Sequence, residues 1–167
     1  MMDGTRPATE HDSYGDAYIR KILSEVKTIA MVGSSTNWNR PSFFAMKYLQ
    51  QKGFRIIPIN PTAHGQTILG EPVFKSLADI RENIGMVDVF RKSEECVAYA
   101  EEAVRIGAKV LWLQLGVRND EAARIAEASG LEVIMNRCPK IEYARLHGEL
   151  SWNGINSGVI SSKRRKI

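Results

Sequence analysis

Short apolar runs alternate along this chain with segments of helical periodicity, and this alternation restricts the folds open to it. The apolar runs are TIAMVG (28–33), FRIIPINP (54–61), MVDVF (86–90), KVLWLQLG (109–116) and LEVIM (131–135). Amphipathic segments occupy 14–24, 41–51, 93–107, 119–130 and 140–150. This order predicts βαβ units and a parallel sheet covered by helices on both faces. We expect an α/β, Rossmann-like three-layer fold with about five strands, and a loop between the second run and GEPVFKSL (70–77).

The expected sheet also predicts where a ligand would lie. In open parallel sheets, ligands bind outside the carboxyl ends of the strands, near the point where the strand order reverses. The residues directly after the apolar runs are therefore the first candidates. They are Gly33-Ser34-Ser35, Asn60-Pro61, Phe90-Arg91-Lys92, Gln114-Leu115-Gly116 and Asn136-Arg137-Cys138.

The loop after the first run has features of a phosphate-binding turn. Gly33 permits a tight turn that a side chain would block. The hydroxyls of Ser34 and Ser35 and the amides of the loop would face an anion at the N-terminus of the next helix. Pro41 suits the first turn of that helix, and Arg40 before it could clamp a phosphate. The alternative interpretation is a strand-to-helix turn that binds no ligand.

Ordinary NAD binding fits the sequence poorly. The dinucleotide fingerprint G-x-G-x-x-G would need glycines where Ser35 and Trp38 stand. An NAD domain also places an acid near the end of its second strand to bind the ribose hydroxyls. Here that strand ends in Asn60-Pro61, and no acid follows before Glu71. The pattern favours a phosphate-bearing ligand other than NAD. The alternative is that the chain is an NAD(P)-dependent oxidoreductase.

The net charge of +4 arises in the C-terminal tail. Lys163, Arg164, Arg165 and Lys166 account for four of the 23 basic residues, so the remaining 19 balance the 19 acidic ones. A nucleic-acid footprint should lie on the folded domain, so the charge distribution argues against nucleic acid as a partner. A regulatory module that binds nucleic acid through this tail is a further alternative.

The chain length fits one domain. We expect a flexible N-terminal extension at 1–13, the domain at 14–150 and a C-terminal extension with the basic tail at 151–167. No apolar run is long enough for a bilayer, and the N-terminus lacks the apolar core of a signal peptide. With only Cys96 and Cys138, the composition fits a reducing cytoplasm.

No catalytic or metal-binding pattern is visible. His11, His64 and His147 lie far apart in the sequence, and no Cys/His spacing fits a metal site. A surface helix end explains His147 beside Glu149 better than acid–base chemistry does. The sequence therefore predicts neither an enzyme nor a metalloprotein.

Five segments together resemble a known family. They are TIAMVGSS…RPSFFAMKYLQQKGFRIIPINP, GEPVFKSL, VDVFR, VLWLQLG and NRCPKIEYARL, in this order over about residues 14 to 150. This set resembles the stand-alone CoA-binding domain proteins of the YccU-like type. Those proteins are in turn similar to the N-terminal CoA-binding domain of the succinyl-CoA synthetase alpha subunit. The resemblance implies a Rossmann-like fold without the dinucleotide fingerprint, and coenzyme A or an acyl-CoA as ligand.

The resemblance also implies which residues contact coenzyme A. The pyrophosphate would lie on Gly33, Ser34 and Ser35, and the adenosine beside Asn60 and Pro61. The pantetheine arm would pass two strand ends, at Phe90, Arg91 and Lys92 and then at Leu113, Gln114 and Leu115. The Asn-Cys-Pro of the synthetase is echoed by Asn136, Cys138 and Pro139, with Arg137 inserted.

Two departures from the synthetase bear on function. Where its loop has a lysine that contacts CoA, this chain has Ala63, so His64, Arg40 or Lys92 would have to hold the 3′-phosphate. The phosphorylated histidine of the synthetase belongs to a second domain, and this chain is too short to contain it. We therefore expect binding without catalysis, as a sensor, carrier or accessory protein, with a homodimer or another protein as a possible partner.

Cys138 has two interpretations. It follows the fifth apolar run, where the pantetheine arm should end, so its thiol could form a mixed disulfide with CoA. Neighbouring Arg137 and Lys140 would favour the thiolate. Alternatively, Cys138 fills space before Pro139. Cys96 lies in an expected helix and should be packed away.

Overall fold

The computed structural model describes residues 11–148. Its main sheet has five parallel strands in the order β2-β1-β5-β6-β7. They are β1 (Thr28–Val32), β2 (Arg55–Ile59), β5 (Met86–Val89), β6 (Val110–Leu113) and β7 (Glu132–Ile134). The five-stranded Rossmann-like α/β fold expected from the alternating sequence is confirmed.

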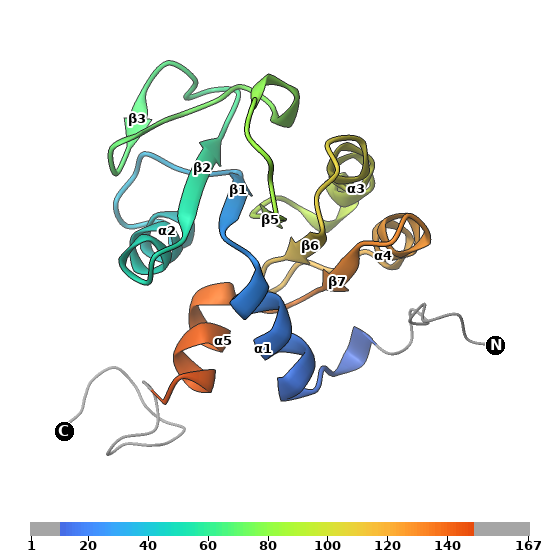
Figure 1. Ribbon diagram of the computed structural model, residues 1–167. Coiled ribbons are helices and arrows are strands. Elements are labelled where there is room, and N and C mark those ends of the chain that lie inside the picture. Colours follow the sequence, from blue (N-terminus) through green and yellow to red (C-terminus); the bar gives the residue numbers. More distant parts are fainter. Residues whose placement is uncertain (1–10, 149–167) are drawn as a thin grey trace.

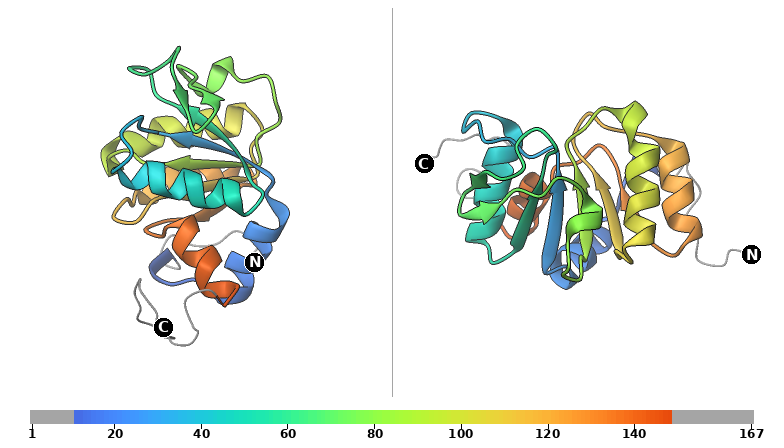
Figure 2. Two further views of the ribbon diagram at one scale, coloured as in Figure 1. Left: turned by 90° about the vertical axis from the view of Figure 1, so that its left-hand side faces the viewer. Right: turned by 90° about the horizontal axis from the view of Figure 1, so that it is seen from above.

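Helices cover both faces of the sheet, as Figures 1 and 2 show. One face carries α1 (Asp16–Glu25), α2 (Pro41–Gln51) and α5 (Pro139–Leu146), and the other carries α3 (Cys96–Arg105) and α4 (Asp120–Ala128). Alternate residues of each strand enter different cores. Ile29 and Met31 pack beneath α1 and α2, whereas Ala30 and Val32 pack beneath α3 and α4. Burial on both faces explains why the strands are apolar almost throughout.

The strand order reverses beside β1. The chain passes from β1 to its neighbour β2, and then crosses to β5 on the other side of β1. The carboxyl ends of β1 and β5 consequently form the switch point at which this class of sheet binds ligands.

A small hairpin stands where the sequence analysis expects a loop. It pairs β3 (Thr67–Ile68) with β4 (Glu71–Pro72). Its two turn residues, Leu69 and Gly70, both have positive φ, at 49° and 85°. Turns of this kind usually carry Asn-Gly or Asp-Gly, so Leu-Gly gives no clear signal in the sequence.

The first described residues belong to the domain. Residues 11–13, assigned above to a flexible extension, precede α1, and His11 is almost fully buried. The boundary expected at residue 14 is thus too late. The C-terminal extension and its basic tail lie outside the described residues, as does Glu149. Within residues 11–148, no helix is both long and apolar enough to cross a membrane.

Candidate ligand-binding site

Gly33 lies at the switch point in a conformation that excludes a side chain. Its φ is +84°, and a Cβ atom placed on it would lie 2.5 Å from the carbonyl oxygen of Phe90. The amides of Gly33 and Ser34 both donate to the carbonyl oxygen of Ile59, at 2.9 and 3.2 Å. The ends of β1, β2 and β5 are therefore drawn together around this glycine.

The polar groups of the following loop are used within the fold. Ser34 is 1% exposed, and its hydroxyl donates to the carbonyl oxygen of Met31 at 2.6 Å. The amide of Ser35 donates to the hydroxyl of Ser42 at 3.1 Å, and the side chain of Asn60 donates to the carbonyl oxygen of Ser34 at 2.7 Å. In this conformation the amides of residues 33–35 and the hydroxyl of Ser34 shape the loop. They do not present the open anion cradle expected from the sequence.

A first cavity of about 710 Å³ lies at the carboxyl edge of the sheet, between α2 and the ends of β5 and β6. Its lining residues are Pro41, Phe44, Ala45, Phe90, Arg91, Lys92, Gln114, Leu115, Val117, Cys138, Lys140 and Ile141. None of the described residues that line it is acidic. A volume of this size is in the range of small-molecule sites.

A second cavity of about 600 Å³ lies between the ends of β1 and β2 and helix α3. Gly33, Asn60 and Pro61 line it together with Lys75 and the carboxylates of Glu94, Glu95 and Glu102. Arg91 lines both cavities. The two cavities therefore meet at one cation, two residues after the end of β5.

Nine of the predicted contact residues line at least one of the two cavities. They are Gly33, Asn60, Pro61, Phe90, Arg91, Lys92, Gln114, Leu115 and Cys138. Five predicted residues line neither cavity, namely Ser34, Ser35, Arg40, His64 and Leu113. Leu113 is fully buried in the core beneath α3 and α4. Arg40 and His64 are exposed in loops, and no ion pair within residues 11–148 involves Arg40.

Arg91 already has an anionic partner. Its guanidinium pairs with the carboxylate of Glu95, with 2.9 Å between Nε and Oε1. This hydrogen bond is the main cause of a raised pKa for Arg91, and the charge of Glu95 adds to it. The pair is substantially exposed, so its contribution to stability is small. An anionic ligand at the junction of the cavities would share Arg91 with Glu95.

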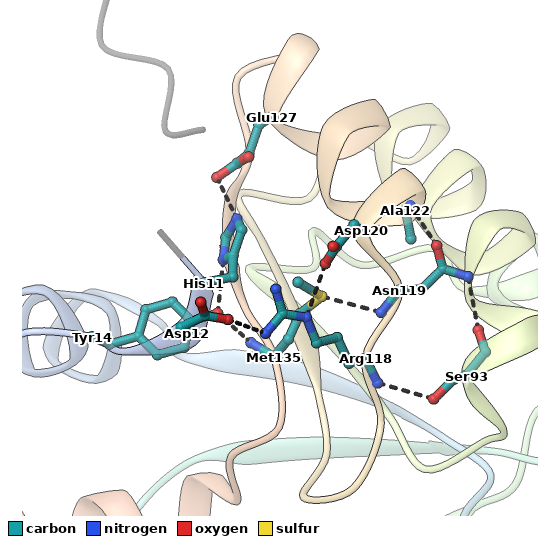
Figure 3. A network of polar contacts seen from close by, with 10 residues as sticks. All are labelled: His11, Asp12, Tyr14, Ser93, Arg118, Asn119, Asp120, Ala122, Glu127 and Met135. Atoms are coloured by element: carbon teal, nitrogen blue, oxygen red, sulfur yellow. Dashed lines mark hydrogen bonds and ion pairs between the residues drawn. The ribbon is translucent and has the colours of Figure 1, made fainter. Parts of the chain in front are cut away.

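Three strand-end loops are tied to one another by polar side chains, and Figure 3 shows the contacts of Ser93 with Arg118 and Asn119. Ser93, just after Lys92, accepts a hydrogen bond from the amide of Arg118 through its hydroxyl and one from the side chain of Asn119 through its carbonyl. Asn136, at a φ of 60°, accepts from the amide of Gly116 at 2.7 Å. The loops that carry the lining residues are thus held by contacts between distant parts of the chain.

The N-terminal segment braces the same loops (Figure 3). The ring of His11 lies between the hydroxyl of Tyr14, 2.7 Å from Nδ1, and the carboxylate of Glu127, 3.2 Å from Nε2. Tyr14 in turn accepts a hydrogen bond from the amide of Met135 at 2.8 Å. The histidine that the sequence analysis leaves without a role therefore joins the N-terminal segment to α4.

Asp88 is an acidic residue buried within the central sheet. It lies in the middle of β5, in register with Met31 and Trp112, and is fully buried. Neither carboxylate oxygen has a hydrogen-bond partner within the described residues. Burial raises the pKa of Asp88 well above its ordinary value, which favours the protonated acid. The sequence analysis did not identify Asp88 because a single acid in an apolar run has no motif of its own.

Sequence analysis also missed cavity residues that do not follow a main strand. Lys75 reaches the second cavity because the amide of Asn60 bonds to the carbonyl of Phe74, at the bridge between Ile59 and Phe74. Phe44 reaches the first cavity from α2, and Ile141 reaches it from α5. No three His, Cys, Asp or Glu side chains in residues 11–148 are grouped so that they could hold a metal ion.

A doubly wound α/β domain with cavities at its switch point has the arrangement that is typical of small-molecule-binding proteins. The chain matches the family described as "CoA binding domain" over residues 27–144, and it belongs to this family. Two expectations from the sequence are thereby confirmed: the chain belongs to a CoA-binding domain family, and it has a Rossmann-like fold.

Individual proteins and solved structures are also similar to this chain. The uncharacterised protein YneT of Bacillus subtilis (strain 168) is 40% identical over 128 residues, which cover 77% of this chain and 93% of YneT. A hypothetical protein from Pyrococcus horikoshii OT3 has a TM-score of 0.77 at 38% identity, with 88% of this chain and all of that chain covered. A dinucleotide-forming acetyl-coenzyme A synthetase from Ca. Korarchaeum cryptofilum shares the fold alone, at 20% identity and a TM-score of 0.55 over 66% of this chain and 26% of that chain.

Proposed function

We propose that this chain binds coenzyme A or an acyl-CoA in the two adjoining cavities, and that it acts in the cytoplasm as a sensor, carrier or accessory protein without catalysis of its own. The observation that carries the proposal is the position of Arg91, which lines both cavities at the switch point. An elongated ligand with a phosphate group near its middle fits this arrangement. Membership of the CoA-binding family supports the same ligand.

In this proposal each cavity receives one end of the ligand. The adenosine end occupies the second cavity beside Asn60 and Pro61, and the pantetheine arm occupies the first cavity along Phe90 and Gln114. Gln114 is buried, and its Oε1 has no hydrogen-bond partner within the described residues. A pantetheine amide would satisfy this acceptor, whose burial without a partner is otherwise costly.

Lys75 is our candidate for the 3′-phosphate. It is exposed, lines the adenosine cavity beside Asn60, and forms no ion pair within residues 11–148. Arg40 and His64 line neither cavity, and Lys92 lines only the other one. The synthetase contacts CoA through a lysine at the position of Ala63 in this chain. In our proposal Lys75, at the end of GEPVFK, makes the contact with the phosphate instead.

The test is a comparison of ligands by thermal unfolding. CoA should raise the midpoint much more than NAD or NADP does, because a ligand at a hundred times its dissociation constant stabilises the folded state by about 2.7 kcal/mol. The second cavity does contain acids, but Glu94 and Glu95 follow β5 and do not stand at the end of β2 where NAD domains place theirs. Equal midpoint shifts with CoA and NAD, or a shift with NAD alone, would exclude the proposal.

The same assay examines Lys75. Lys75→Ala should lower the affinity for CoA roughly tenfold, which corresponds to a lost charge-assisted contact of about 1.5 kcal/mol. It should leave the affinity for dephospho-CoA unchanged, because dephospho-CoA lacks the 3′-phosphate. Lys109→Ala is the matched control, since Lys109 is an exposed lysine just before β6, at the opposite edge of the sheet. If both ligands weaken equally, Lys75 does not contact the 3′-phosphate.

We further expect CoA disulfide to modify Cys138 and not Cys96. Cys138 lines the first cavity, whereas Cys96 is buried and its burial raises the pKa of its thiol to about 11. In the exchange, the Cys138 thiolate attacks one sulfur of CoA disulfide, a Cys138–CoA disulfide forms, and the other CoA leaves as a thiolate that takes a proton from solvent. Intact mass should show one adduct in the wild type and in Cys96→Ser, and none in Cys138→Ser. An adduct that survives Cys138→Ser would remove Cys138 from this chemistry.

A further inference from the structure

The first cavity is lined by large apolar side chains as well as by charged and polar ones. Three large apolar side chains that line it are well exposed, with Leu115 at 60%, Phe44 at 49% and Ile141 at 41%. They come from three separate parts of the chain, namely the loop after β6, helix α2 and helix α5. Exposed apolar residues gathered around one hollow are a mark of a binding surface.

The chemistry of the lining separates this cavity from the second one. The charged residues that line it, Arg91, Lys92 and Lys140, are all cations. The second cavity has Glu94, Glu95 and Glu102 as well as Lys75 and Arg91. A pantetheine arm carries two amides and a hydroxyl, and each needs a polar partner when it is buried. Phe44, Leu115 and Ile141 cannot supply such partners.

We infer that the first cavity holds the acyl chain of an acyl-CoA, and that this protein prefers acyl chains of several carbons to free CoA. The inference rests on the proposed function and specifies its ligand. The pantetheine arm lies along Gln114 with its sulfur near Cys138, and the hydrocarbon chain continues against Phe44, Leu115 and Ile141. A cavity of about 710 Å³ has room for such a chain.

A concave site favours this occupant over a second protein. Stable protein interfaces bury about 800 Å² on each partner over broad surfaces, whereas small-molecule sites are hollows of several hundred Å³. Trp38 is also an exposed large apolar residue, at 69%, but it does not line the cavity. It provides a matched control for the loss of exposed apolar surface.

The experiment measures dissociation constants of the full chain for CoA, acetyl-CoA and hexanoyl-CoA by calorimetry. Hexanoyl-CoA should bind at least about tenfold more tightly than acetyl-CoA, because each buried methylene is favourable. The readout is the ratio of these two constants within each variant. In Phe44→Ser/Ile141→Ser the ratio should fall to near one, and in Trp38→Ser it should stay at the wild-type value. Thermal unfolding shows that each variant is folded.

The possible outcomes separate this inference from the proposed function. If the wild type binds CoA and hexanoyl-CoA equally well, the acyl subsite is excluded and CoA binding stands. If neither CoA nor any acyl-CoA binds, the proposed function fails, and the inference fails with it. If light scattering shows a dimer that Phe44→Ser/Ile141→Ser dissociates, while the wild-type ratio is near one, the occupant is a second copy and the inference is overturned.

Discussion

Replacing Gly33 with alanine is expected to lower the free energy of unfolding by about 3 kcal/mol. Two effects add. A positive φ disfavours every side chain that has a Cβ, and the new atom would lie 2.5 Å from the carbonyl oxygen of Phe90 and 3.0 Å from Cδ of Arg91. The contact with Phe90 is the more serious, because that oxygen belongs to the backbone at the end of a central strand. Chemical denaturation at neutral pH measures the change.

Gly107→Ala isolates the first of these effects. Gly107 has a similar φ of +77°, and nothing lies within 4 Å of a Cβ atom placed there. This variant should lose only about 1 kcal/mol, the cost of the positive φ. Gly33→Ala should also bind CoA more weakly, because relief of the contact displaces Phe90 and Arg91 from the cavities. If the two variants lose the same stability, the close approach of β1 to the residue after β5 is not as described.

The second large effect concerns Asp88 and pH. Because burial raises the pKa of Asp88 in the folded state, this carboxyl favours folding most at low pH, and its contribution is lost as the pH rises toward the folded pKa. Asp88→Asn removes the ionisation while keeping the shape. Relative to this variant, the free energy of unfolding of the wild type should fall by about 1.4 kcal/mol for each unit by which the pH rises. This fall is confined to the interval between the unfolded and folded pKa values of Asp88.

Denaturation curves from pH 4 to pH 8 measure this difference. Asp79→Asn controls for the loss of a carboxylate, since Asp79 is an exposed residue at the end of a short 3₁₀ turn (Leu77–Asp79). A difference between wild type and Asp88→Asn that stays constant over the whole range would show that the pKa of Asp88 is not raised in the folded state. A buried acid without a partner must exhibit the pH dependence.

The sequence predicts the sheet well because the pattern that determines it is local. Five apolar runs separated by amphipathic segments leave few arrangements other than a parallel sheet with covered faces. The hairpin around Leu69 is not predicted, because its turn lacks the usual residues. The packing of His11 is not predicted either, since its partner Glu127 lies on another element far along the chain.

The candidate site is predicted where it follows directly from strand ends. Phe90, Arg91 and Gln114 line a cavity because every parallel strand delivers its next residues to the same edge. Lys75 and Ile141 arrive from other elements, and only the tertiary structure brings them to the cavities. Residue type also gives no indication of direction: the sequence shows a serine at Ser34 but not that its hydroxyl faces the main chain.

Because Arg91 lines both cavities, the proposed binding mode has a consequence for how the two halves of coenzyme A would bind. A nucleotide fragment and an acyl-pantetheine fragment would each bind one cavity weakly, and each would have to draw on the same guanidinium. In the joined molecule the second half would bind intramolecularly, at an effective concentration that reaches the millimolar range for short flexible linkers. Affinity for the whole molecule would then far exceed the affinity for either fragment. Free nucleotides would be poor competitors, although they are chemically identical to one end of the ligand.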